Sequence, residues 1–125
     1  MIDHVSLGTN DVARAKAFYD PVLAVVQMTL QAETSSELLY GAGSFMISIV
    51  VPLDGEPATP GNGTHIAFAA RDRAMVDRFY EVALANGGTS DGAPGTRSEY
   101  DAHYYGAFVR DPDGNKIEAV TMMSG

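Results

Sequence analysis

The chain has 125 residues, of which 46% are hydrophobic and 19% charged, a composition typical of one folded globular domain. Its formal net charge of −8 argues against nucleic acids and anionic membranes as partners, because both need a basic surface on the protein. The absence of cysteine excludes disulfides, thiol catalysis and thiolate metal sites. No apolar run reaches membrane-spanning length and no signal-peptide pattern is present, so we expect a cytoplasmic location.

The first half of the chain predicts a strand, a helix and three further strands. Residues 1–8 alternate loosely between apolar and polar side chains, as a strand does. Asn10 or Asp11 can cap a helix that runs to about residue 24, and Pro21 is expected to kink or end it. The further strands are expected at residues 25–32, 37–41 and 44–51.

The second half repeats this order after a loop at residues 53–63 that is rich in glycine, proline and polar side chains. Residues 64–70 predict a strand, and Asp72 can cap a second helix that ends at the glycines after Asn86. Residues 89–103 are polar and glycine-rich and predict at most one short strand.

A β-hairpin is predicted where two strand-like runs flank Asp111-Pro112-Asp113-Gly114. Proline presets φ for the second turn position, aspartates bond to the nearby backbone, and glycine tolerates positive φ. The second strand of the hairpin carries Glu118 between Ile117 and Ala119. A carboxylate on an apolar strand is costly unless a cation or a donor meets it, so Glu118 is a candidate functional residue.

An internal repeat relates the two halves, because His4 and His65 are 61 positions apart and the same offset joins other pairs. These pairs are Asp11 with Asp72, and Phe18-Tyr19 with Phe79-Tyr80. Each half then reads β-α-β-β-β. We expect one domain over residues 1–125, with module 1 at about 1–53, a linker at 54–62 and module 2 at about 63–125.

These features together resemble the vicinal oxygen chelate superfamily. The resemblance rests on the two β-α-β-β-β halves, a histidine in each first strand, Phe-Tyr in each helix, and Asp-Pro-Asp-Gly-Asn before a strand glutamate. The superfamily includes glyoxalase I, type I extradiol dioxygenases, fosfomycin-resistance thiol transferases and bleomycin-resistance proteins. The resemblance implies an α+β fold in which curled sheets form a cup with the helices outside. It also implies a homodimer, with each cup completed within one chain or across two.

Three side chains are predicted to hold a metal ion. Strand alternation puts His4, His65 and Glu118 each on the face opposite its bulky aliphatic neighbours. Two imidazoles and one carboxylate match a facial triad with open coordination positions, and by resemblance they fall on the ligand positions of the superfamily. The pattern predicts a divalent metal ion without distinguishing Fe, Mn, Zn and Ni. The alternative is that both histidines are structural, since bleomycin-resistance-type members keep the fold without a metal.

Glyoxalase I-like enzymes carry a fourth, acidic ligand in the first half. Aligning Gly43 with Gly114 places Ile47 at the position in module 1 that matches Glu118, with Ser48 next to it. Neither side chain is a convincing ligand. This departure disfavours a glyoxalase I reaction.

The resemblance implies a metal-dependent glyoxalase- or dioxygenase-like protein that acts on a small oxygen-chelating substrate as a lyase, transferase or dioxygenase. The alternative is a non-catalytic protein of bleomycin-resistance type that binds or sequesters a small molecule. The sequence names neither the substrate nor the reaction.

Five further side chains are candidates for a supporting shell around the metal or for substrate contacts. The alternative is a loop histidine beside core tyrosines and an arginine that pairs with an acid such as Asp111. The candidates are Ser6, His103, Tyr104, Tyr105 and Arg110.

Overall fold

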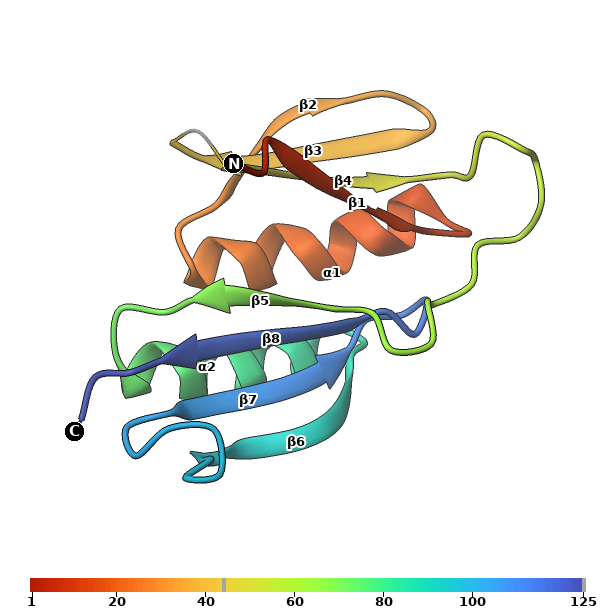
Figure 1. Ribbon diagram of the computed structural model, residues 1–125. Helices are drawn as coiled ribbons and strands as arrows, with labels where there is room; N and C mark the ends of the chain where they lie inside the picture. The colour runs from red at the N-terminus through yellow and green to blue at the C-terminus, as the bar shows by residue number, and fades with distance from the viewer. Residues whose placement is uncertain (44, 125) are drawn as a thin grey trace.

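The computed structural model describes residues 1–43 and 45–124, with Phe45 described by its backbone alone. Two βαβββ modules follow one another along the chain, which confirms the predicted fold (Figure 1). The first contains β1 (His4–Gly8), α1 (Val12–Val25), β2 (Thr29–Glu33), β3 (Glu37–Ala42) and β4 (Phe45–Val50). The second contains β5 (His65–Ala69), α2 (Arg73–Ala85), β6 (Thr89–Thr96), β7 (Tyr105–Arg110) and β8 (Lys116–Thr121).

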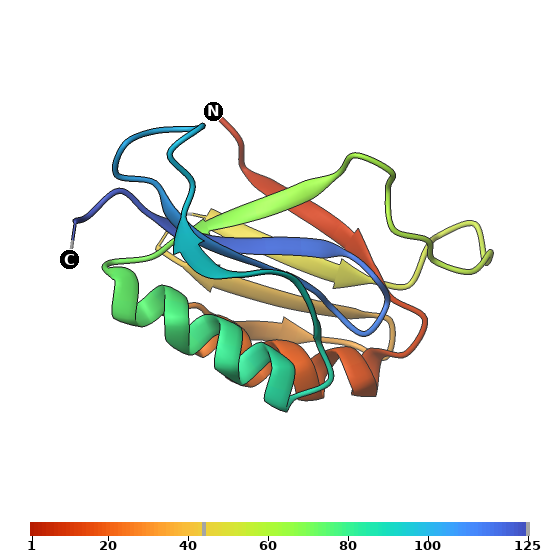
Figure 2. The ribbon, with the colours of Figure 1, turned by 90° about the horizontal axis from the view of Figure 1, so that it is seen from below.

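Each module forms one four-stranded mixed sheet, and neither sheet closes into a barrel. The strand orders are β1-β4-β3-β2 and β5-β8-β7-β6, with β1 parallel to β4 and β5 parallel to β8. The two sheets lie side by side with β1 and β5 at their inner edges, and both helices cover the same side of them (Figures 1 and 2). The opposite side of the sheets is therefore free to carry a site.

Both helices begin as the sequence predicts. Asp11 and Asp72 are the N-caps, and their side chains accept hydrogen bonds from the backbone amides of Arg14 and Met75. Pro21 does not end the first helix, which continues to Val25. Fully buried apolar side chains on the last two turns stabilise the helix there, and this packing outweighs the missing N–H of the proline. No helix in the described ranges is long and apolar enough to cross a membrane.

The strand predicted at 25–32 is wrong in its first half, because β2 begins only at Thr29. The chain leaves α1 through Gln27, which has a φ of +67°, and the amide of Met28 bonds back to the carbonyl of Leu23. Val26 and Met28 are buried in the core at this turn. Their apolar side chains therefore indicate core packing of a turn and not a strand. Of the strand predicted at 44–51, residue 44 lies outside the described residues and the strand runs Phe45–Val50.

The turn between β7 and β8 joins the two modules. Asp113 accepts hydrogen bonds from the hydroxyl of Thr9 at 2.6 Å and from the backbone N–H of Asn10 at 2.9 Å. It also forms an ion pair with Arg14, with 2.7 Å between Nη2 and Oδ1. One carboxylate of module 2 therefore binds the start of α1 in module 1.

Asp111 makes a second connection through the same turn. It is buried and accepts a hydrogen bond from the hydroxyl of Tyr19 on α1 at 2.5 Å. Asn115 donates from Nδ2 both to Asp111 and to the carbonyl of Gly8, each at 2.9 Å. The motif read from the sequence as a hairpin turn is thus also the polar contact that fixes β8 relative to the first module.

Candidate functional site

Glu118 is a buried carboxylate on the sheet face that the helices leave uncovered. Ile117 and Ala119 belong to the hydrophobic core, and strand alternation turns Glu118 to the opposite side. Its side chain is only 1% exposed, so its oxygens need partners within the protein. They have two, because Oε1 lies 3.0 Å from Nε2 of His65 and Oε2 accepts a hydrogen bond from the hydroxyl of Tyr104.

The two partners of Glu118 differ in their access to solvent. The imidazole of His65 is 41% exposed, so one side of it remains free to meet a ligand. Burial, followed by the hydrogen bond and negative charge of Glu118, raises the pKa of Tyr104 well above its ordinary value. Tyr104 therefore stays protonated at neutral pH and acts as a donor to Glu118.

A cavity of about 330 Å³ opens over this group. The rings of Tyr100 and Tyr104 meet edge to face with 5.0 Å between their centroids, and Phe108 lies 6.1 Å from the ring of His65. Aromatic walls around a polar base are typical of small-molecule sites. The cavity is lined by His65, Tyr100, Tyr104, Phe108 and Glu118.

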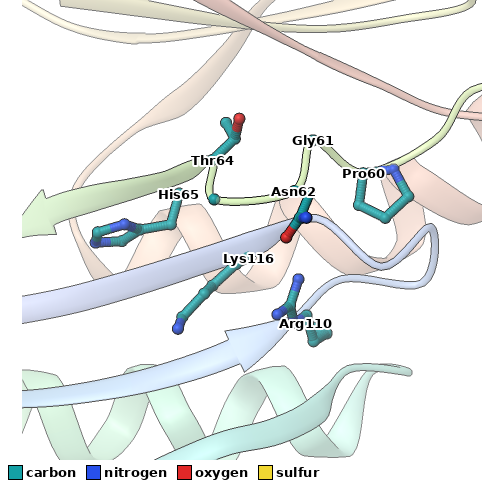
Figure 3. A pocket seen from close by; sticks show the side chains of 8 residues that line it. Pro60, Gly61, Asn62, Thr64, His65, Arg110 and Lys116 are labelled. Atoms are coloured by element: carbon teal, nitrogen blue, oxygen red, sulfur yellow. The ribbon is translucent and has the colours of Figure 1, made fainter.

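A second cavity of about 340 Å³ shares His65 with the first and is shown in Figure 3. Lys116 and Arg110 reach it from β8 and β7, and the loop at residues 60–64 forms its other wall. The ammonium of Lys116 lies 5.0 Å from the centre of the Phe108 ring, which places it between the two cavities.

His65 and Glu118 are spaced as neighbouring ligands of one metal ion would be. Two donors bound at about 2.1 Å and roughly at right angles to one another are about 3.0 Å apart. The Nε2 to Oε1 distance of 3.0 Å equals this value, and it is equally the distance of a hydrogen bond. An imidazole and a carboxylate also suit a divalent transition metal, so these two residues fit the predicted group.

His4 lies apart from this pair. It is exposed on β1, and its Nδ1 is 2.8 Å from the carboxylate of Asp3. The strands β1 and β5 run in opposite directions along the inner edges of the sheets (Figure 1), so His4 and His65 start from opposite ends. Over residues 1–43 and 45–124, no three His, Asp or Glu side chains are grouped in a way that could hold a metal ion. The structure of one chain thus brings together His65 and Glu118 without His4.

The other sequence candidates divide between the site and its surroundings. Tyr104 and Arg110 line the two cavities, whereas Tyr105 donates its hydroxyl to Asp77 of α2 at 2.6 Å, on the helix side of the sheet. His103 is exposed in the loop before β7 and lines neither cavity. Ser6 lines a small cavity of about 120 Å³ at the junction of the modules.

The counterpart of Glu118 in module 1 is Ser48, and the predicted alignment with Ile47 is wrong. In the parallel ladders Ser6 pairs with Ser48, as Ala67 pairs with Glu118. The prediction failed because the residue that pairs with the first-strand histidine stands three positions after Gly43 but only two positions after Gly114, so the two glycines are not equivalent. The position that matches Glu118 is therefore a serine and still not an acid. The hydroxyl of Ser48 donates to Glu37 on β3 at 2.5 Å.

Sequence reasoning missed several residues that line the cavities, among them Lys116 and Tyr100. Lys116 stands two positions before Glu118 on β8, so the same strand alternation that selected Glu118 could have found it. Tyr100 lies in an exposed loop, and no local pattern indicated that its ring meets Tyr104.

Comparisons with known proteins agree with this fold. Residues 1–119 match the model of the Glyoxalase/Bleomycin resistance protein/Dioxygenase superfamily. A glyoxalase/bleomycin resistance protein from Albidiferax ferrireducens T118 has 38% sequence identity and a TM-score of 0.88, with 96% of this chain and 97% of that chain covered.

Two more distant relatives carry names of enzymes. The metallothiol transferase FosB of Shouchella clausii is 25% identical over 120 residues, which are 96% of this chain and 79% of that protein. Lactoylglutathione lyase from Agrobacterium tumefaciens shares the fold at 22% identity and a TM-score of 0.70, with 96% of this chain and 92% of that chain covered. The family model over nearly the whole chain and the 38% identical structure agree with the paired βαβββ modules. The chain therefore belongs to the Glyoxalase/Bleomycin resistance protein/Dioxygenase superfamily.

Proposed function

We propose that this protein is a divalent-metal-dependent, glyoxalase- or dioxygenase-like protein that acts on a small substrate through two oxygen atoms of that substrate. The observation that carries the proposal is the pair of His65 and Glu118, with 3.0 Å between Nε2 and Oε1, at the base of an aromatic-lined cavity. Membership of the superfamily, and the similarity to a protein named as a metallothiol transferase, support it.

The remaining protein ligand in this proposal is His4 from a second copy of the chain. His4 is exposed on the uncovered side of the first sheet, so it is accessible to another molecule. A symmetric dimer would supply it twice, once to each His65 and Glu118 pair. The proposed assembly is therefore a homodimer in which each site takes residues from both chains.

The ion would act as a Lewis acid that stabilises negative charge developing on substrate oxygens. The protein's own residues have separate parts. Tyr104 donates a hydrogen bond to Glu118 and so fixes the orientation of the carboxylate. Phe108 and Tyr100 wall the cavity and limit the access of water to a bound molecule.

The test is the metal content of variants purified without chelators. Glu118→Gln keeps the volume of the side chain but removes its charge, and we expect its metal content to fall from about one ion per chain to below about a tenth. Glu99→Gln, an equal change at an exposed acid of the same module, is the matched control and should retain the metal. A Glu118→Gln protein that retains a full complement of metal would refute the proposal.

Mixing two variants that each fail to hold the metal tests whether each site is shared between chains. In a mixed dimer of His4→Gln with Glu118→Gln, one site combines both changes, and the other has all three wild-type ligands. Mixing should therefore restore about one ion per mixed dimer, which is about half an ion per dimer averaged over an equimolar mixture, provided that each site spans two copies. A site built within one chain would give no restoration.

A second candidate function is the metal-free binding of a small molecule. It is favoured by the aromatic lining of the cavity and by the absence of a three-ligand group within the described part of one chain. Wild-type protein that takes up no Fe, Mn, Zn or Ni, yet binds an apolar small molecule in this cavity, would establish it.

A further inference from the structure

We propose that Arg110, Lys116 and the loop at residues 60–64 bind an oxyanion, either a carboxylate or a phosphate-type group, that the substrate carries at one end. The inference rests on the proposed function in one respect, since the same molecule is to reach His65 and Glu118. The cavity that these residues line holds about 340 Å³, which is large enough for such a group together with water.

The cavity is positive in a chain that is strongly negative. Arg110 and Lys116 are cross-strand partners on β7 and β8, and both side chains line the cavity (Figure 3). Asp91 neutralises only one of the two charges, with its Oδ2 at 3.0 Å from Nε of Arg110 and 3.5 Å from Nζ of Lys116. The group thus keeps one net positive charge in a protein of formal net charge −8, and this makes it a local target for anions.

The hydrogen-bonding groups at the cavity are incompletely used. Arg110 donates from Nε to Asp91 and from Nη1 to the carbonyl of Gly114, while Nη2 makes no hydrogen bond to any described residue. Asp91 does not line the cavity, so it holds the guanidinium from the side and leaves Nη2 for a ligand. The backbone N–H groups of Asn62 and Gly63 likewise have no partner among the described residues.

The cavity lined by Arg110 and Lys116, here called the oxyanion cavity, lies next to the aromatic cavity over Glu118, so one molecule can occupy both. His65 lines both cavities and pairs directly with Lys116 in the β5–β8 ladder. Lys116 and Glu118 are two positions apart on β8, so they project from the same face of the sheet. A small molecule that reaches Glu118 with one end can therefore place an anionic group against Lys116 with the other.

The experiment measures binding of inorganic phosphate and, separately, of acetate by NMR titration of the full chain, before and after metal is stripped with EDTA and the EDTA is removed by dialysis. We expect Arg110→Gln and Lys116→Gln each to weaken binding of the preferred anion about tenfold or more, since each removes one charged donor. Arg78→Gln removes the same charge from the exposed face of α2, away from this cavity, and should leave the affinity within about twofold. The binding should persist after the metal is stripped, because it does not need a metal.

Four results would overturn the inference: no binding of either anion, equal affinities in all three variants, an equal loss in Arg78→Gln, or loss of binding after the metal is stripped. Metal content separates this inference from the proposed function. Arg110→Gln and Lys116→Gln should take up metal as wild type does. Wild-type protein that holds metal but binds neither anion refutes only the oxyanion cavity, whereas anion binding in a chain that takes up no metal refutes only the proposed metal site.

Discussion

The hydrogen bond between Tyr19 and Asp111 makes the connection between the two modules directly testable. The hydroxyl of Tyr19 on α1 donates to Oδ2 of Asp111 in the β7–β8 turn at 2.5 Å. Tyr19 is fully buried and Asp111 is 4% exposed, so water cannot replace the lost partner. The Tyr19→Phe variant removes the hydroxyl and keeps the ring in the core.

The expected cost follows from what remains around Asp111. Its Oδ2 still accepts from Nδ2 of Asn115, and its Oδ1 from the backbone amides of Asp113 and Asn115. The carboxylate is therefore not left unpaired, and the loss is that of one hydrogen bond to a charged group, about 1.5–3 kcal/mol. A carboxylate stripped of its partners would cost about 3–5 kcal/mol.

Urea unfolding followed by circular dichroism measures this loss as a change in the free energy of unfolding. Tyr40→Phe is the matched control, because Tyr40 is also fully buried but donates to Asp20 within module 1 at 2.7 Å. The side chain of Asp20 is 39% exposed, so water can replace the hydroxyl, and we expect a loss of about 0.5–1.5 kcal/mol. A loss below about 0.5 kcal/mol for Tyr19→Phe, or one no larger than that of Tyr40→Phe, would refute the reasoning.

Two further predictions concern the surroundings of Glu118. A Cβ at Gly106 would lie 3.1 Å from Oε2 of Glu118 and 3.2 Å from the ring of Tyr104, so Gly106→Ala should displace the carboxylate. We expect a loss of about 1–3 kcal/mol in the free energy of unfolding, measured in urea, and a lower metal content. Unchanged metal content would contradict this prediction. The raised pKa of Tyr104 means that the folded state holds the phenol proton more tightly than the unfolded state does. The stability that Tyr104 contributes is therefore full below about pH 10 and is lost as pH rises through the pKa of the folded state. Ultraviolet titration should show the pKa of Tyr104 falling in Glu118→Gln, since the charge of Glu118 is one of its causes, and a pKa unchanged from wild type would contradict this assignment.

Local sequence patterns were sufficient to predict the repeat and the order of the elements, although β2 begins later than predicted and β6, expected only as a short strand, has eight residues. The caps at Asp11 and Asp72 depend on a short side chain that accepts bonds from amides in the next turn, so they are visible in sequence. Strand alternation likewise put Glu118 on the face opposite Ile117 and Ala119, which the structure confirms. Each of these inferences involves residues within a few positions of one another.

Errors arose where packing between distant segments outweighed local preference. Pro21 lies inside α1 because the buried side chains around it hold the helix against its own sheet and against α2. The equivalence of Glu118 with Ser48 depends on the lengths of two turns, which glycine positions alone do not reveal. The aspartates of the β7–β8 turn bind residues of module 1 about a hundred positions away, and no local pattern contains that information.

The candidate metal site shows the same division. The sequence by itself determined that His4, His65 and Glu118 each face away from the aliphatic side of a strand, because side chains alternate along a strand with a period of two. Only the tertiary structure decided which of them meet. Parallel pairing of β5 with β8 brings His65 to Glu118, whereas the opposite directions of β1 and β5 keep His4 of the same chain away. Alternation specifies a face, but the distance between two residues depends on strand order and direction, which packing of the whole chain sets.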